Sequence, residues 1–157
     1  MKMLLRTVLA AGLLAGLSAH AATVGQPAPA FTVTDTKGVT HNLADFKGKT
    51  VVLEWHNPKC PFVVKHYEPK NMQGQQQAAT GDGVVWITVN SGAPGKQGHM
   101  SADEANTLMA SKGAAYSAYV IDAEGTVGKA YAAKTTPHMY VIDAEGVLRY
   151  NGAIDSI

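Results

Sequence analysis

The chain has 157 residues, of which 46% are hydrophobic and 16% are charged, and this length corresponds to one globular domain. With 13 basic and 12 acidic residues the formal net charge is +1, and no basic patch occurs, so nucleic acid is not an expected partner. A single cysteine excludes a disulfide within the chain, so any disulfide must join the protein to another molecule.

Residues 1–21 have the pattern of a secretory signal peptide. A basic start is followed by an apolar run at 7–17, which is shorter than the ~20 residues needed to span a bilayer. Small residues then precede a cleavage site after Ala21. We therefore expect a mature domain at 22–157 in the periplasm, without stable insertion in the membrane.

Apolar periodicity and turn residues predict an alternation of strands and helices along the mature chain. The segment 83–90 is almost continuously apolar, as expected of a strand covered on both faces. Ser101 and Glu104 form a capping box that begins a helix, and Gly113 ends it. The predicted strands are 31–34, 39–41, 50–55, 83–90, 119–121, 138–142 and 147–150, and the predicted helices are 61–67, 71–79, 102–112 and 126–132. This order predicts an α/β sheet with helices on both faces.

The final hairpin, 138–150, needs a further helix to cover its outer face. The sequence stops at Ile157, soon after this hairpin. We therefore expect the domain to lack its C-terminal helix and the chain to be incomplete at that end.

Cys60 occupies the junction between a predicted buried strand at 51–55 and a predicted helix. Pro61 suits the first helical position, which makes Cys60 the N-cap and points its sulfur at free backbone N–H groups. These groups favour the thiolate, and Lys59 and His56 are expected to add positive potential. A buried, inert cysteine is the alternative, but the strand before and the proline after favour a nucleophile.

Four local sequences follow one another in a particular order and spacing. They are GQPAPAF at 25–31, the strand ending LEW before Cys60, TTPHMYVID at 135–143 and LRYNGAID at 148–155. Together they resemble the peroxiredoxin-like branch of the AhpC/TSA (redoxin) group, and the resemblance covers nearly the whole mature chain. It implies a thioredoxin-like α/β fold in which helices flank a central mixed sheet.

The resemblance also assigns roles around the cysteine. In the CPFV segment, Cys60 takes the first position of the thioredoxin Cys-x-x-Cys motif and Val63 the second, so the attacking thiol is kept and the resolving thiol is absent. Glu54, six residues earlier, matches a buried acid that relays protons during disulfide exchange. The residues alone leave open whether Glu54 is buried or points to an edge or to solvent, but burial would raise its pKa and suit proton transfer.

Thr136 and Pro137 match the loop in which thioredoxin-fold proteins place a cis-proline beside the active thiol. The resemblance implies that the Thr136 backbone binds an extended substrate and that His138 lies near the sulfur. From the residues alone, Pro137 could equally be a trans proline at the start of a strand, and His138 a plain strand residue.

Peroxiredoxins differ from this chain in three respects. Asn57 stands where they have Thr or Ser three residues before the cysteine, and Arg149 is a poor substitute for their later arginine. In addition, Cys60 matches the first thioredoxin cysteine, whereas the peroxidatic cysteine matches the second. We therefore do not expect a fast peroxidase.

Three functions remain open. The first is an exported thiol oxidoreductase that acts on protein or small-molecule thiols and disulfides, uses an external reductant and needs no cofactor. The second is a one-cysteine antioxidant that reduces peroxides through a sulfenic acid. The third is a carrier of a soft metal such as Cu(I), held by Cys60 with His56, His66 or His138, although their spacing matches no metal motif.

Other conspicuous side chains have structural interpretations. Lys65 and His66 are expected on a solvated helix face. Four aromatic residues fall in predicted strands and are expected in the core or on a sheet face: Trp55, Trp86, Tyr119 and Tyr140.

Overall fold

The computed structural model describes residues 22–156, and the expected signal peptide at 1–21 lies outside the described residues. The strands are β1 Thr32–Thr34, β2 Thr40–Asn42, β3 Val51–Trp55, β4 Val85–Asn90, β5 Ala118–Ile121, β6 His138–Ile142 and β7 Leu148–Gly152. The helices are η1 Leu43–Phe46, a 3-10 helix, and α1 Pro61–Tyr67, α2 Asn71–Gly81, α3 Ala102–Lys112 and α4 Thr126–Tyr131.

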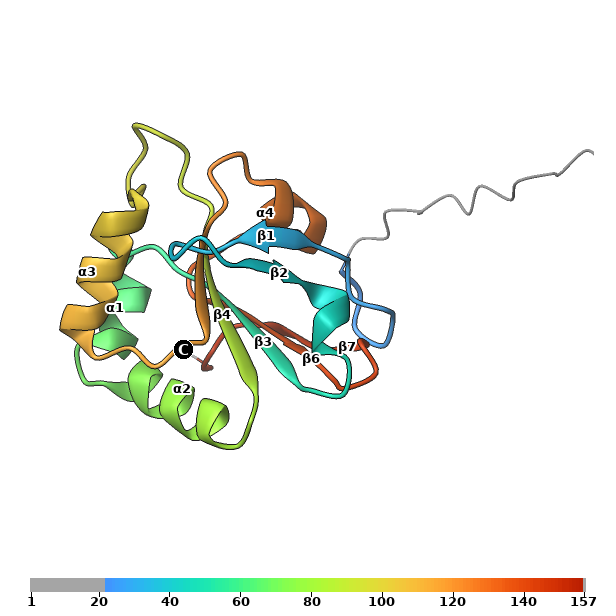
Figure 1. The fold of residues 1–157 in the computed structure, drawn as a ribbon. Coiled ribbons are helices and arrows are strands. Elements are labelled where there is room, and N and C mark those ends of the chain that lie inside the picture. The colour runs from blue at the N-terminus through green and yellow to red at the C-terminus, as the bar shows by residue number, and fades with distance from the viewer. Residues whose placement is uncertain (1–21, 157) are drawn as a thin grey trace, which may run out of the picture.

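Five strands form the central sheet in the order β5-β4-β3-β6-β7 (Figure 1). The middle strand β3 runs parallel to β4 and antiparallel to β6, so the sheet is mixed. β1 and β2 form a separate antiparallel hairpin. These findings confirm the predicted α/β class and the central mixed sheet.

The sheet is buried on both faces. Helices α1, α2 and α3 cover one face, whereas α4 and the β1–β2 hairpin cover the other (Figure 1). Because side chains alternate along a strand, β3 sends Val51, Leu53 and Trp55 into one core cluster and Val52 into the other. Glu54 points to the same face as Val52, toward α1 and α2. The strand aromatics expected in the core are all buried: Trp55, Trp86, Tyr119 and Tyr140.

The predicted elements and the observed ones agree closely in kind and in place. The capping box of α3 is present: Ser101 Oγ accepts from the Glu104 backbone N–H, and Glu104 Oε2 accepts from the Ser101 backbone N–H at 2.8 Å. The prediction missed η1, which Asn42 caps through its side chain. Among residues 22–156, no helix has both the length and the apolar character that crossing a bilayer requires. A further helix after β7 stays a prediction.

The predicted solvated face of α1 is wrong for His66. Its ring is buried, with Nδ1 2.7 Å from the Asn71 amide and Nε2 3.3 Å from the Asp155 carboxylate. Lys65 is half exposed and pairs with the same carboxylate at 2.8 Å. The reason is that the segment after β7 packs against α1, and this contact depends on tertiary structure rather than on helical periodicity.

Candidate active site

Cys60 is the N-cap of α1, as predicted, and its thiol is partly exposed. Its backbone N–H donates to the Asn57 carbonyl at 3.0 Å, and Pro61 begins the helix. Its Sγ lies 3.0 Å from the Thr136 carbonyl oxygen, to which the protonated sulfur donates. The sulfur therefore sits where the turn after β3 meets the loop before β6.

The environment of the Cys60 sulfur favours its ionised form. Burial raises the pKa of the thiol, but the Thr136 side chain and then the backbone N–H groups of Val63 and Phe62 in the first turn of α1 favour the thiolate, and the net pKa lies below its ordinary value. Pro61 contributes by starting the helix at this point, which leaves the following N–H groups free for the sulfur. A partly exposed sulfur with a lowered pKa is suited to nucleophilic chemistry.

Neither of the two side chains expected to add positive potential lowers the thiol pKa, and the reasons differ. Lys59 is exposed, and its charge is not among the causes of the lowered thiol pKa. His56 is buried, and burial lowers its pKa to about 4, so the ring is neutral at pH 7. The expectation of a positive His56 is therefore wrong, because the end of β3 carries this residue into the interior.

Glu54 is fully buried in the middle of β3, which settles the alternative that the sequence left open. Four side chains donate to its carboxylate. Tyr67 Oη lies 2.7 Å from Oε1, while the other three meet Oε2: Trp86 Nε1 at 2.9 Å, Gln76 Nε2 at 3.0 Å and Thr88 Oγ1 at 3.3 Å.

Burial dominates the electrostatics of this carboxylate. It raises the pKa of Glu54 above the ordinary value, although the four hydrogen bonds act in the opposite direction. Burial and the charge of Glu54 also raise the pKa of Tyr67. Tyr67 lies on α1, the helix that Cys60 caps, and packs in the same apolar cluster as Cys60. Cys60 therefore precedes the first residue of this short helix, and Tyr67, which donates to Glu54, is its last residue.

Thr136 and Pro137 lie beside the thiol. The Thr136–Pro137 peptide bond is cis, Pro137 is buried, and the Thr136 carbonyl makes the 3.0 Å contact with Sγ. The register of the sheet produces this arrangement, because Trp55 at the end of β3 is paired with His138 at the start of β6.

His138 has an internal set of partners. Its Nδ1 accepts from the Lys134 backbone N–H at 3.2 Å, so Nε2 carries the proton and donates to Asn151 Oδ1 at 2.8 Å. The Tyr140 hydroxyl also lies 3.2 Å from Nδ1. The buried ring therefore ties the loop before β6 to β7, and these contacts favour positioning of the loop over direct contact with a substrate.

Arg149 lies far from the thiol along the sheet. It pairs with Asp143, which follows β6. In the register of the sheet, the β6 residue Ile142 faces Val51, at the opposite end of β3 from the turn that carries Cys60. The described residues therefore place no arginine beside the sulfur.

Metal ligands are not gathered around Cys60. Within residues 22–156, no three or more His, Cys, Asp or Glu side chains are placed together to hold an ion. The three histidines considered as partners, His56, His66 and His138, instead bond to other protein groups.

Sequence reasoning missed the donors around Glu54. Trp86 was expected only as a core residue, and Tyr67, Gln76 and Thr88 were not singled out. One signal was available: the parallel pairing of β3 with β4 sets Glu54 opposite Thr88, so polar residues on β4 were candidates. The contributions of α1 and α2 follow only from helix packing.

Comparisons with known proteins place this geometry in a family. The AhpC/TSA family model matches residues 24–151, and the chain belongs to this family. The chain is similar to the thiol-disulfide oxidoreductase ResA of Geobacillus kaustophilus (strain HTA426), with 28% identity over 136 residues, 82% of this chain and 68% of that protein.

Solved structures have the same fold. An uncharacterised conserved protein from Geobacillus kaustophilus superposes with a TM-score of 0.76 and 26% identity, over 87% of this chain and 71% of the other. The exposed lipoprotein thioredoxin Etrx1 of Streptococcus pneumoniae strain TIGR4 superposes with a TM-score of 0.59 and 27% identity, over 82% and 91% of the two chains. The thioredoxin-like fold implied by the sequence is confirmed.

The buried neutral His56 predicts a specific pH dependence of stability. Between its folded pKa of about 4 and the ordinary 6.5, the unfolded chain binds a proton that the folded chain does not. The free energy of unfolding should therefore rise between pH 4 and pH 6.5, with a contribution on the order of 3 kcal/mol from this residue, and level off above that range.

The variant His56→Asn tests this prediction, because Asn keeps a polar group near the Tyr119 hydroxyl but does not titrate. Urea denaturation of both proteins at pH 4.5 to 7.5 measures the difference. The variant should lose most of the rise, and an identical pH profile in the two proteins would contradict the assignment.

Proposed function

We propose that this chain is an exported thiol–disulfide oxidoreductase that works through Cys60 alone. The observation that carries the proposal is the Cys60 sulfur with a lowered pKa, 3.0 Å from the Thr136 carbonyl beside Pro137. The similarity to ResA, whose name states this activity, supports the same class of reaction.

The reaction is a pair of thiol–disulfide exchanges. The Cys60 thiolate attacks one sulfur of a disulfide, a new S–S bond joins Sγ to that sulfur, and the other sulfur leaves as a thiolate. Because the sequence contains no second cysteine, a thiol from another molecule then attacks the mixed disulfide and releases Cys60. The electron pair passes from the incoming thiol to the substrate disulfide, so no cofactor is required.

The residues around Cys60 have separate tasks in this proposal. The Thr136 carbonyl accepts the S–H proton only while the sulfur is protonated, so ionisation frees this backbone group to pair with an extended substrate. Pro61 and the first turn of α1 stabilise the thiolate. Glu54, with its raised pKa, handles the proton that the exchange releases or consumes.

A peroxidase reaction is less well supported. It would require donors that polarise the O–O bond beside the sulfur, yet Arg149 is paired with Asp143 and lies at the other end of the strands. The Asn57 amide is engaged as well, because its Nδ2 donates to the Gln97 carbonyl at 3.5 Å and its Oδ1 accepts from the Lys59 backbone N–H at 2.9 Å.

Export is part of the proposal, with cleavage after Ala21 and a redoxin domain at 22–157 in the periplasm. The contacts of Ala22 support this boundary, because it packs against the core and its carbonyl accepts from the Asn151 amide at 3.3 Å. Mass spectrometry of the protein after expression with its leader tests the boundary, and any N-terminus other than Ala22 would contradict it.

The choice between disulfide and peroxide substrates is testable directly. The reduced protein should form a mixed disulfide at Cys60 with a model disulfide such as 4,4′-dithiodipyridine, and its reaction with hydrogen peroxide should be no more than about tenfold faster than that of a free model thiol, since the peroxide-activating donors are missing. Stopped-flow absorbance and mass spectrometry measure both rates. Cys60→Ser should abolish both reactions, and faster oxidation by peroxide would favour the antioxidant.

The role of Glu54 predicts a defect in Glu54→Gln. We expect disulfide exchange at pH 7 to slow by about 10²-fold, because the amide occupies the same space but carries no exchangeable acid proton. Thr88→Val is the matched control: it removes one donor to the carboxylate at nearly constant volume and should change the rate by less than about twofold. The pH profile of Glu54→Gln should also lose one ionisation, and equal rates and profiles in all three proteins would contradict the role.

A further inference from the structure

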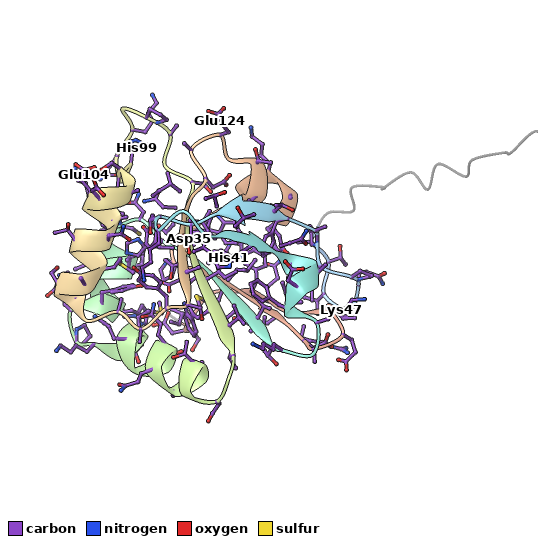
Figure 2. The ribbon with its side chains drawn as sticks, viewed as in Figure 1. Asp35, His41, Lys47, His99, Glu104 and Glu124 are labelled. Atoms are coloured by element: carbon purple, nitrogen blue, oxygen red, sulfur yellow. The ribbon has the colours of Figure 1, made fainter. Side chains whose placement is uncertain are left out.

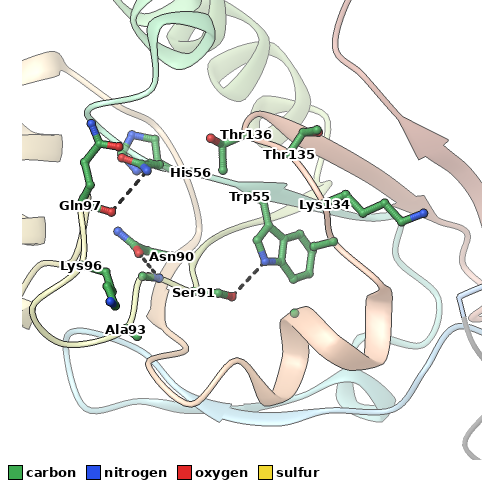
Figure 3. A pocket seen from close by; sticks show the side chains of 14 residues that line it. Trp55, His56, Asn90, Ser91, Ala93, Lys96, Gln97, Lys134, Thr135 and Thr136 are labelled. Atoms are coloured by element: carbon green, nitrogen blue, oxygen red, sulfur yellow. Dashed lines mark hydrogen bonds between the residues drawn. The ribbon is translucent and has the colours of Figure 1, made fainter.

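A pocket of about 420 Å³ lies next to the active-site turn. Its walls come from the end of β3, the loop after β4 and the loop before β6, and they include Trp55, Ser91, Lys96 and Lys134 (Figure 3). The volume is within the range of small-molecule sites in proteins, about 300–1,000 Å³.

The pocket shares its wall with the groups that hold the thiol. Thr136 lines it, and the carbonyl of the same residue is 3.0 Å from Cys60 Sγ. Asn57 also lines it and accepts from the Cys60 backbone N–H at 3.0 Å. Cys60 itself is not one of the lining residues, so the pocket adjoins the thiol through Thr136 and Asn57.

The charges at the pocket are of one sign. Lys96 and Lys134 are exposed and lie on opposite sides of it in Figure 3, and neither ammonium has an ion pair among residues 22–156. Their long, rotatable side chains can reach over the opening. No carboxylate lines the pocket, and the nearby Asp122 is buried and accepts the Ser91 hydroxyl at 2.7 Å and the Gly128 N–H at 2.9 Å.

The remaining wall suits a peptide-like ligand. The side-chain amide of Gln97 and the hydroxyl of Thr135 offer donors and acceptors, and the indole of Trp55 is fixed by its 3.0 Å hydrogen bond to Ser91. Amides on the wall match amides on a ligand, and free ammonium groups match carboxylates.

We propose that this pocket binds a small peptide-like thiol or disulfide that carries carboxylates, and that this molecule exchanges with Cys60. The inference rests on the proposed function and names its small-molecule partner. In the forward step the Cys60 thiolate attacks one sulfur of the bound disulfide, Sγ joins that half, and the other half leaves as a thiolate. Attack by a second molecule of the small thiol on the same mixed disulfide reverses the step and releases Cys60.

Three disulfides of different charge test the proposal: glutathione disulfide is anionic, bis(2-hydroxyethyl) disulfide is neutral and cystamine is cationic. Mass spectrometry gives the rate of Cys60 adduct formation for each, divided by the rate of a free model thiol with the same probe. We expect the normalised rate of adduct formation with glutathione disulfide to be about tenfold higher than that with the neutral probe at low ionic strength. The rate with cystamine should be lower than that with the neutral probe, and salt should reduce both differences.

Charge-reversal variants locate the effect. Lys96→Glu and Lys134→Glu should each lower the rate of adduct formation with glutathione disulfide several-fold, and together about tenfold. The rate with the neutral probe should change by less than about twofold. Lys47→Glu is the control, because Lys47 follows η1 on the far side of the molecule from His99, which lies in the loop that carries Lys96 (Figure 2). If Lys47→Glu lowered the rate with glutathione disulfide equally, the proposal that the ligand binds in this pocket would be overturned.

A binding measurement distinguishes a failure of the proposed function from a failure of the proposed pocket. The Cys60→Ser protein cannot react, and S-methylglutathione should change its tryptophan fluorescence in a saturable way that Lys96→Glu with Lys134→Glu weakens. No adduct with any of the three disulfides would overturn the proposed function. If the three adducts formed at equal normalised rates and Cys60→Ser bound no S-methylglutathione, the proposed ligand pocket would be overturned but the proposed function would stand.

Discussion

The complete burial of β3 is the constraint on which the rest of the site depends. Both faces of this strand are covered, so every residue in it has a fixed direction and depth. Its pairing with β6 brings Thr136 and Pro137 to the end where the chain turns into α1, and its pairing with β4 brings the loop after Asn90 to the same end. The thiol therefore lies at the meeting point of three segments that are distant in sequence.

A carboxyl group inside this strand carries a free-energy cost that hydrophobic packing alone would avoid. Four donors reduce the cost for Glu54 without removing it, and burial still raises its pKa. His56, which follows β3 and is also buried, is neutral at pH 7 because burial lowers its pKa. The interior packed against α1 thus holds an acid whose proton is retained more tightly than in water, which suits the proton transfer that we propose for Glu54.

The sequence predicted the framework well because local patterns determine it. The apolar run of β3, Pro61 after Cys60 and the capping box of α3 each depend on neighbouring residues, and all three are as expected. The environment of the site was harder to predict. The donors to Glu54 come from two helices and a second strand, and the burial of His66 depends on Asp155, 89 positions along the chain. Contacts of this kind follow from packing and not from periodicity.

The pH dependence of Cys60 alkylation measures whether the fold stabilises the thiolate. The reference is the unfolded protein in urea, whose thiol should titrate near the ordinary pKa of about 8.5. We expect a midpoint clearly below that reference for the folded protein, with labelling in the native state. A midpoint at or above the reference, or labelling only after unfolding, would make Cys60 a structural residue and contradict the account.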